Sequence, residues 1–240
     1  MSPRIISYGK CFLCGKKIAK NVATRHLAKC LPLHEEASEK VVRLFHLRAE
    51  GAYAPIYWLD FEILATATLL DLDDFLRAIW LECCGHLSAF TIKNVRYELD
   101  TGMVDAMWKG FFGPYRPVRS MDSKLYQVLA PGDVFKHEYD FGTTTELKLK
   151  VIGERQGPLP KRSIRILARN YAPLIRCTEC EQPAKWLSTS YQPYCEEHAQ
   201  KHEEWMEGSF LPLVNSPRTG DCAYTGPENK SLRFEETVPA

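Results

Sequence analysis

The chain of 240 residues lacks any run of about 18 to 20 uninterrupted apolar residues, the length that a helix needs to span a bilayer. Its first residues also lack the apolar stretch typical of a secretory signal. No phosphate-binding Gly loop, Gly-x-Ser-x-Gly elbow or His-Glu-x-x-His pair occurs anywhere in the sequence. These absences argue against a membrane protein, an exported protein and several common enzyme classes. We therefore expect a folded cytoplasmic protein.

Acidic residues are missing from one region, residues 1–34, although the whole chain carries a net charge of only +1. The basic residues of this region are Arg4, Lys10, Lys16, Lys17, Lys20, Arg25 and Lys29. A concentrated basic patch suits phosphate-rich partners, so DNA or RNA is the partner that the sequence favours. The alternative is an acidic protein surface or another subunit.

Nine cysteines are present, and six of them fall into two sets that each include a His. An odd total, Cys-x-x-Cys pairs and no export signal favour reduced, metal-binding thiols over disulfides. The first set is Cys11, Cys14, His26 and Cys30, and the second is Cys177, Cys180, Cys195 and His198. Each offers four thiolate or imidazole donors, which matches a tetrahedral zinc ion. We therefore predict two zinc ions per chain, with no open coordination position for catalysis.

The first set resembles the spacing of a Cys2His2-type finger whose last His is replaced by Cys. His26 and Cys30 are four residues apart, so they share one face of a helix expected to begin near Lys20. Phe12, Ile18, Val22 and Leu27 are the expected small core of this module.

If the finger docks as other fingers do, Ala19, Val22 and Arg25 meet base edges, and only Arg25 reads bases well. The predicted nucleic-acid contacts are Lys16, Lys17, Lys20, Arg25 and Lys29. The lysines serve as phosphate contacts, which give salt-sensitive affinity with little sequence information. The alternative is a structural finger whose lysines are merely solvated.

The second set is expected to fold as a small zinc ribbon or treble-clef-like module. Trp186 and Tyr191 lie in the ribbon between its two ligand pairs, and a helix over 196–206 follows. That helix is rich in Glu, which argues against phosphate contact at this end. A structural role is therefore the interpretation for this set.

The pattern of the remaining chain predicts an α+β fold with a central antiparallel sheet and packed helices. The expected organisation is a basic finger over 1–33, a linker helix over 34–51, an α+β domain over 52–170, a zinc module over 171–210 and an irregular tail over 211–240. Strands are expected at 56–64, 87–92, 134–141, 146–152 and 163–168, a helix at 72–84, and a long packed loop at 100–122.

Residues 52–170 resemble the plasmid pRiA4b ORF-three-like family, also described as insertion-element passenger proteins. The phrases that carry the resemblance are Leu72-Asp73-Asp74-Phe75-Leu76, Gly85-His86-Leu87-Ser88-Ala89-Phe90 and Tyr139-Asp140-Phe141-Gly142. The resemblance implies an α+β domain, a prokaryotic, mobile-element setting and a molecular function that is largely unassigned. The family continues the last phrase with Asp, Trp and His, where this chain has Thr143, Thr145 and Leu147. Any chemistry that depends on those three residues is thus lost here.

Several residues allow a catalytic interpretation. Cys83, Cys84 and His86 could supply a nucleophile and a base, although buried thiols and a hydrogen-bonded His are the commoner roles. Glu138 and Asp140 alternate along a strand and could act as paired carboxylates, as in a hydrolase or nuclease. The alternative for them is a solvated acid and an Asp that organises the turn before Gly142. Cys222 is either a free thiol or a neighbour of another Cys.

The sequence as a whole therefore favours a zinc-binding protein that contacts nucleic acid through its basic finger, with no evident catalytic centre. A protein-interaction module is the second interpretation, and a hydrolase or nuclease built on the central domain is the third.

Overall fold

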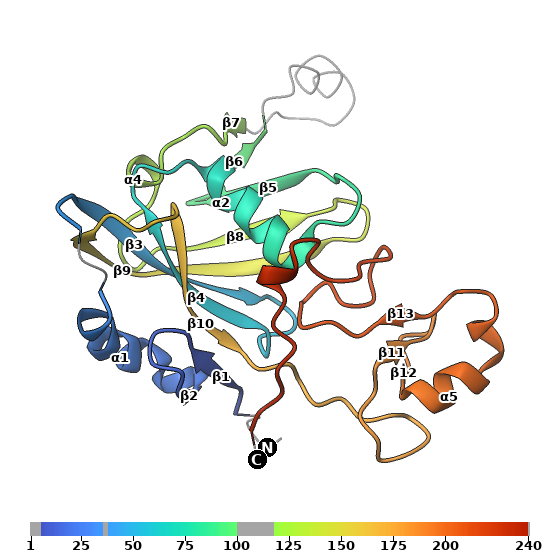
Figure 1. Cartoon of the computed structure of the whole chain (residues 1–240). Coiled ribbons are helices and arrows are strands. Elements are labelled where there is room, and N and C mark those ends of the chain that lie inside the picture. Colours follow the sequence, from blue (N-terminus) through green and yellow to red (C-terminus); the bar gives the residue numbers. More distant parts are fainter. Residues whose placement is uncertain (1–5, 36–37, 100–117, 240) are drawn as a thin grey trace, which may run out of the picture. The chain divides into compact units, whose positions relative to one another are not determined.

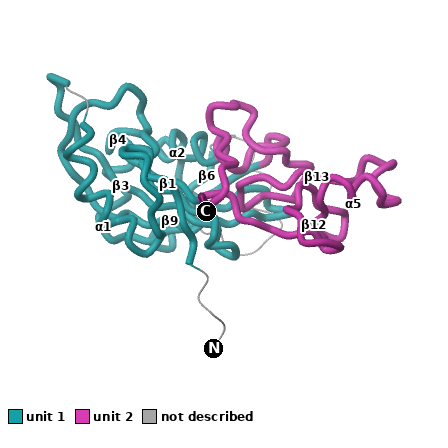
Figure 2. Tube along the Cα trace, turned by 60° about the horizontal axis from the view of Figure 1, so that its bottom comes forward, with its two compact units in different colours: residues 1–76, 87–170 teal, residues 77–86, 171–240 magenta. Residues whose placement is uncertain are grey.

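The computed structural model describes residues 6–35, 38–99 and 118–239, and it divides into two compact units (Figure 2). Unit 1 comprises residues 1–76 and 87–170, and unit 2 comprises residues 77–86 and 171–240. Each unit is thus built from two segments, and those of unit 2 are far apart in the sequence. Within the described ranges, no helix is long and apolar enough to cross a membrane.

Unit 1 is a mixed α+β structure around a large sheet that confirms the predicted fold class (Figure 1). In the described residues its order is β2-β1-β10-β4-β3-β9-β8-β5-β6-β7. The strands are β1 (Tyr8–Cys11), β2 (Lys17–Ala19), β3 (Val41–Gly51), β4 (Trp58–Leu64), β5 (Ser88–Ile92), β6 (Val95–Glu98), β7 (Val118–Ser120), β8 (Val134–Tyr139), β9 (Thr145–Pro158) and β10 (Ile164–Asn170). Every pair is antiparallel except β6 with β7. The helices of unit 1 are α1 (Lys20–Cys30), the 3-10 helix η1 (Leu31–Leu33), α2 (Leu69–Leu76) and α4 (Leu125–Val128).

Strand β4 lies at the centre of the core, and almost all of its side chains are buried. Its sequence, WLDFEIL, therefore places two carboxylates inside the protein. Asp60 accepts hydrogen bonds from Arg48 at 2.7 Å, and Glu62 accepts from Arg155 at 3.0 Å. Buried charges are tolerated when they are paired in this way, and both arginines come from the neighbouring part of the same sheet.

The predicted linker helix over 34–51 is wrong, because residues 41–51 form the long strand β3. Phe45, Leu47, Ala49 and Gly51 are buried at every second position, which is the period of a strand. Leu44 is buried on the opposite face from Phe45, so that the consecutive apolar residues resemble a helical stripe. The register shift against β9 between His46 and Leu47 leaves the extra residue, Ile152, in β9. Pairing with β4 on one side and β9 on the other outweighs that local pattern.

The N-terminal module is continuous with the sheet, because β1 pairs with β10 from Gly9 to Cys11. Helix α1 lies beside the β1–β2 hairpin (Figure 1). Ile18 and Leu27 are buried as expected, together with Trp58 of β4 and Leu167 of β10. Phe12, which was expected in this core, is instead 43% exposed. The module thus completes its core against the sheet and not by itself.

Unit 2 contains a three-stranded sheet of order β12-β11-β13, made from β12 (Pro193–Tyr194), β11 (Trp186–Leu187) and β13 (Leu211–Pro212). Its helices are the π-helix η2 (Arg77–Leu81), α5 (Glu196–Lys201), η3 (Glu203–Trp205) and η4 (Lys230–Leu232). In the range 72–84, where one helix is expected, the α-helix α2 ends at Leu76 and the π-helix η2 follows it. The one expected over 196–206 ends at Lys201 and is followed by a 3-10 turn after His202.

The remaining strand predictions correspond to β4, β5, β8, β9 and β10 within a few residues. Most of the loop predicted over 100–122 lies outside the described residues, and Val118–Ser120 of that range forms β7. Strands β1, β2, β6 and β13 are not among the predicted strands, and the tail predicted to be irregular over 211–240 contains β13 and the 3-10 helix η4.

A substitution at Gly9 tests whether the N-terminal module depends on the pairing of β1 with β10. A Cβ atom there would lie 2.3 Å from the carbonyl oxygen of Arg169 and 2.7 Å from the Trp58 ring. We expect Gly9→Ala to lower the free energy of unfolding by about 1 to 3 kcal/mol, because the backbone of β10 must move. Urea denaturation with Gly153→Ala as the control checks this, since nothing lies within 4 Å of that added Cβ. Equal stability of the two variants would contradict the close approach.

Candidate metal centres

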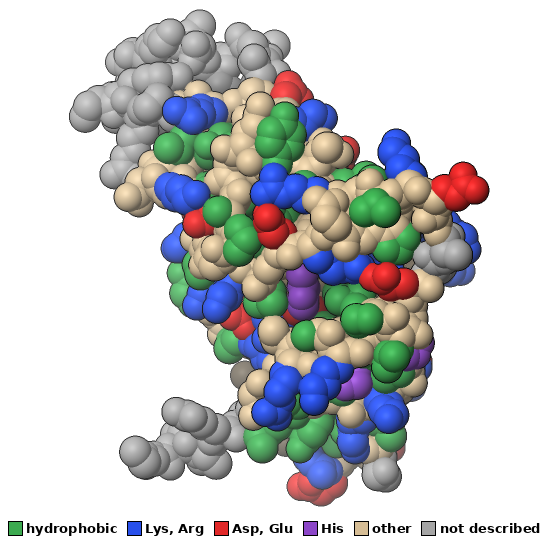
Figure 3. All heavy atoms as spheres, turned by 90° about the vertical axis from the view of Figure 1, so that its left-hand side faces the viewer, with side chains coloured by type: hydrophobic (Ala, Val, Ile, Leu, Met, Phe, Trp, Pro, Cys, Tyr) green, Lys and Arg blue, Asp and Glu red, His purple; other side chains and the backbone are tan. Residues whose placement is uncertain are grey.

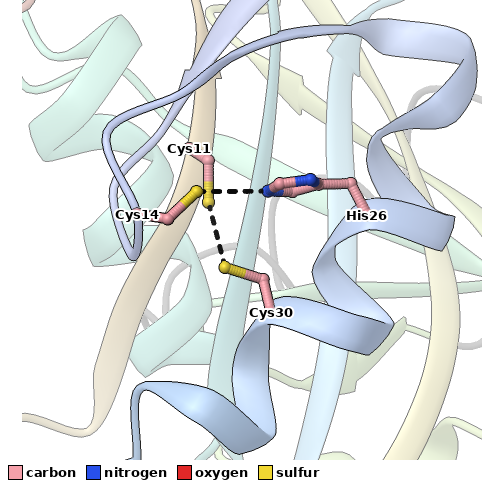
Figure 4. Close-up of side chains that lie close together, drawn as sticks. All are labelled: Cys11, Cys14, His26 and Cys30. Atoms are coloured by element: carbon pink, nitrogen blue, oxygen red, sulfur yellow. Dashed lines mark hydrogen bonds between the residues drawn. The ribbon is translucent and has the colours of Figure 1, made fainter.

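The first predicted set converges at one point between a turn and a helix (Figure 4). Cys11 ends β1, and Cys14 follows in a tight turn through Gly15, whose φ of 74° suits glycine. The Gly15 N–H donates to the Cys11 carbonyl at 2.8 Å, which closes the turn. His26 and Cys30 point to the same place from successive turns of α1.

The spacing of these four donors fits a tetrahedral ion. The Cys11 and Cys30 Sγ atoms are 3.9 Å apart, and Cys14 Sγ lies 3.5 Å from His26 Nε2. Metal–ligand bonds of zinc imply tetrahedral edges of about 3.8 Å between sulfurs and about 3.6 Å between sulfur and nitrogen. The set could therefore hold a metal ion with little movement.

The electrostatics of the first set favour a bound cation. Burial, together with the neighbouring Cys14 and Cys11 thiols, raises the pKa of Cys30 to about 12. Burial and nearby Lys16 lower the pKa of His26, which favours the neutral imidazole that metals bind. The thiols cannot all ionise in this space unless a cation offsets their charge.

The second predicted set also converges, within unit 2. His198 Nδ1 lies 3.4 Å from Cys177 Sγ and 3.4 Å from Cys195 Sγ, and Cys180 Sγ lies 3.9 Å from Cys195 Sγ. Strands β11 and β12 form the predicted hairpin between the two ligand pairs, and Cys195 precedes the first turn of α5. Burial opposes ionisation of Cys177, but backbone N–H groups of Cys195 and Glu179 lower its pKa to about 6.

Aromatic rings surround this second set. The rings of Trp186 and Trp205 meet edge to face at 5.0 Å, and those of Tyr194 and Phe210 at 5.6 Å. The Trp186 indole N–H also donates to Glu196 at 3.0 Å. With strands of only two residues, the ligand set and these rings are what the module has for a core.

A third group of possible metal ligands consists of residues that the sequence pattern does not bring together. Cys83, Cys84, His86 and Cys222 place their donor atoms within 4.8 Å of one another, as the other two sets do. The prediction that Cys222 either stays free or approaches another Cys resolves to the second possibility, because its Sγ lies 3.7 Å from Cys84 Sγ. The sequence offered one signal: the two predicted sets use six of the nine cysteines, and two of the three that remain, Cys83 and Cys84, lie within three residues of His86.

The predicted carboxylate pair does not form one site. Glu138 accepts a hydrogen bond from Arg96 at 2.9 Å, whereas Asp140 leaves the strand at a φ of 64°. Asp140 accepts from the Gly142 N–H at 3.0 Å, which is the turn-organising role. The two carboxylates thus have separate partners.

Another group of catalytic residue types is buried in unit 1. His137 Nε2 lies 2.6 Å from Asp73, and Ser88 donates to the same carboxylate at 2.9 Å. The exposed fractions of His137 and Asp73 are 0% and 1%, so substrate cannot reach them. These bonds instead fix α2 against β5 and β8.

Comparison with known proteins leaves the family open. No family model matches the chain, and no curated protein matches it. A solved structure described as a protein of unknown function, MM3350 from Methanosarcina mazei Go1, is similar over 69% of this chain and 86% of its own, with 14% identity and a TM-score of 0.43. The resemblance to the pRiA4b ORF-three-like family therefore stays a prediction.

The second set can be tested by removing one donor. We expect Cys180→Ser to reduce bound metal by one ion per chain and to shift the tryptophan fluorescence to the red, because Trp186 and Trp205 pack against the set. Elemental analysis and emission spectra of the purified protein measure both effects. Glu181→Ser, at an adjacent side chain that is 90% exposed, is the control. An unchanged metal content in Cys180→Ser would remove this set from the metal centres.

Proposed function

We propose that the protein is a zinc-stabilised nucleic-acid-binding protein whose N-terminal module makes the contact. The observation that carries the proposal is an exposed set of basic side chains on a module whose shape depends on a Cys3His set. Thiolate and imidazole donors in a closed tetrahedral arrangement favour zinc, and a closed set favours a structural role. DNA and RNA share the phosphate chemistry that such a surface recognises.

Four of the five predicted contact residues are exposed in the structure. Lys16 and Lys17 lie in and after the turn of the first set, and Arg25 and Lys29 lie one helical turn apart on α1. On the lower part of the face in Figure 3, Lys and Arg side chains gather with few acidic side chains among them. These residues can reach a phosphate backbone without any rearrangement of the module.

The fifth residue, Lys20, has another role. Its ammonium group pairs with Glu50 of β3 and donates to the Pro55 carbonyl at 2.7 Å. Lys20 therefore fastens the start of α1 to the sheet, and the proposed contact surface consists of Lys16, Lys17, Arg25 and Lys29.

The charge of the module supports binding to a polyanion. Zinc with three thiolates carries about one negative charge, which the surrounding lysines and arginines exceed. Ala19 and Val22, beside Arg25, offer at most methyl contacts to bases. We therefore expect moderate affinity, strong dependence on salt and little sequence preference.

Removal of two of the four charges tests this proposal. We expect Arg25→Ala with Lys29→Ala to weaken binding and to reduce the slope of log K against log salt concentration, since each side chain would neutralise one phosphate. The expected reduction is about 1.8 on duplex DNA and about 1.4 on single-stranded RNA. Fluorescence anisotropy with a labelled DNA duplex and a labelled single-stranded RNA, each over a salt series, measures the slope.

The matched control is Lys148→Ala with Lys150→Ala, which removes the same charge from two exposed positions of β9. If both double variants lose affinity equally, the effect is only that of net charge and the module has no special role. Wild-type protein that binds neither probe at low salt would rule out the proposal and favour an acidic protein as the partner.

A further inference from the structure

The group formed by Cys83, Cys84, His86 and Cys222, here called the third set, lies entirely within unit 2. Its first three members follow the π-helix η2, and its fourth lies in the segment before η4. Cys222 is 136 residues from His86 and 138 from Cys84 in the sequence. Three thiols and an imidazole from two distant segments thus meet at one place.

The donor distances match those of the two sets already described. Cys84 Sγ and Cys222 Sγ are 3.7 Å apart, and His86 Nε2 lies 3.2 Å from Cys222 Sγ. The sulfur separation is close to the tetrahedral edge of about 3.8 Å for zinc thiolates and far longer than a disulfide bond of about 2.0 Å. The imidazole contact is somewhat shorter than the edge of about 3.6 Å, so small adjustments of the rings and thiols suffice.

The cysteines of the whole chain divide evenly among the three sets. All nine lie in the described residues, and each set takes three together with one His. No cysteine is left over for a disulfide or for a separate role. The repeated Cys3His composition gives the third set the same preference for zinc as the other two.

The backbone at the third set is bent in a way that its residue types do not favour. Cys222 and Ala223 have φ values of 47° and 55°, in the left-handed region that non-glycine residues rarely adopt. Gly85, between two of the donors, has a φ of 71°. Unfavourable backbone conformations persist where other interactions impose them, and ligation of Cys222 would be such an interaction.

A fully buried arginine supplies the complementary charge. The Arg218 guanidinium is 0% exposed and donates toward Cys83 Sγ at 3.5 Å. A zinc ion with three thiolates leaves about one negative charge, which this cation offsets. Hydrogen bonds from outside the ligand set commonly orient and stabilise ligating groups in metal sites.

We propose that Cys83, Cys84, His86 and Cys222 bind a third zinc ion, which fastens residues 77–86 to the C-terminal segment of unit 2. Each cysteine gives up its thiol proton to solvent as the ion binds, and His86 binds through Nε2. Four protein donors leave no position for water, so the ion is structural. It closes a loop of about 140 residues, where a cross-link removes much conformational freedom from the unfolded chain.

Native mass spectrometry of the full-length protein tests the proposal. We expect three zinc ions per wild-type chain and two in Cys222→Ser, whereas Cys222→His, which keeps a zinc donor, retains three. Thr225→Ala, an exposed position of the same segment, is the control and should also retain three. Wild-type protein with two ions, or Cys222→Ser with three, would overturn the assignment.

A second measurement covers the case in which Cys222→Ser fails to fold. In the wild-type protein we expect the peptides with Cys83, Cys84 and Cys222 to resist alkylation until a chelator is added, and then to react as free thiols. A Cys84–Cys222 disulfide, or rapid alkylation without chelator, would exclude metal at the third set. Neither result depends on nucleic-acid binding, so the two proposals can fail separately.

Discussion

Repulsion between thiolates is the constraint on which this architecture depends. Three sulfurs and an imidazole lie within 4.8 Å of one another in three places, and such a group cannot carry its full negative charge without a cation. Burial and the neighbouring thiols raise the pKa of Cys30, whereas backbone N–H groups lower the pKa of Cys177 although burial opposes its ionisation. Where strands are two to four residues long, a bound metal ion would replace the apolar area that a larger core provides.

The two modules use the same donors in different surroundings. Around the first set, Ile18 and Leu27 share a core with Trp58 and Leu167, so a metal ion bound there would add to the support that sheet pairing gives. Around the second set, Trp186, Trp205 and Phe210 provide most of the apolar contact. The first module therefore holds its basic side chains on a structure that is paired with the large sheet.

Sequence reasoning succeeded where the relevant contacts are local. The spacing of His26 and Cys30 on one helix and the Cys-x-x-Cys pairs each involve only a few residues. The donors of both predicted sets lie close together, as expected. Sequence reasoning failed for Val41–Gly51, where buried residues on both faces of the strand resemble a helical stripe and two neighbouring strands decide the outcome. It also could not join Cys222 to Cys84, because nothing in either segment shows which distant segment it meets. The pairing of β1 with β10 is hidden in the sequence for the same reason.

Strands β1 and β10 pair in the fold but are far apart in the sequence, which matters while the chain is being synthesised. The four donors of the first set lie within residues 11–30, so they leave the ribosome together and can take up a metal ion at once. Their sheet partner, residues 168–170, emerges far later. Until then, the sulfurs that are buried in the folded module remain open to oxidants. A metal ion bound early would keep those thiols reduced during that interval, so metal supply would affect the yield of folded chains as well as their stability.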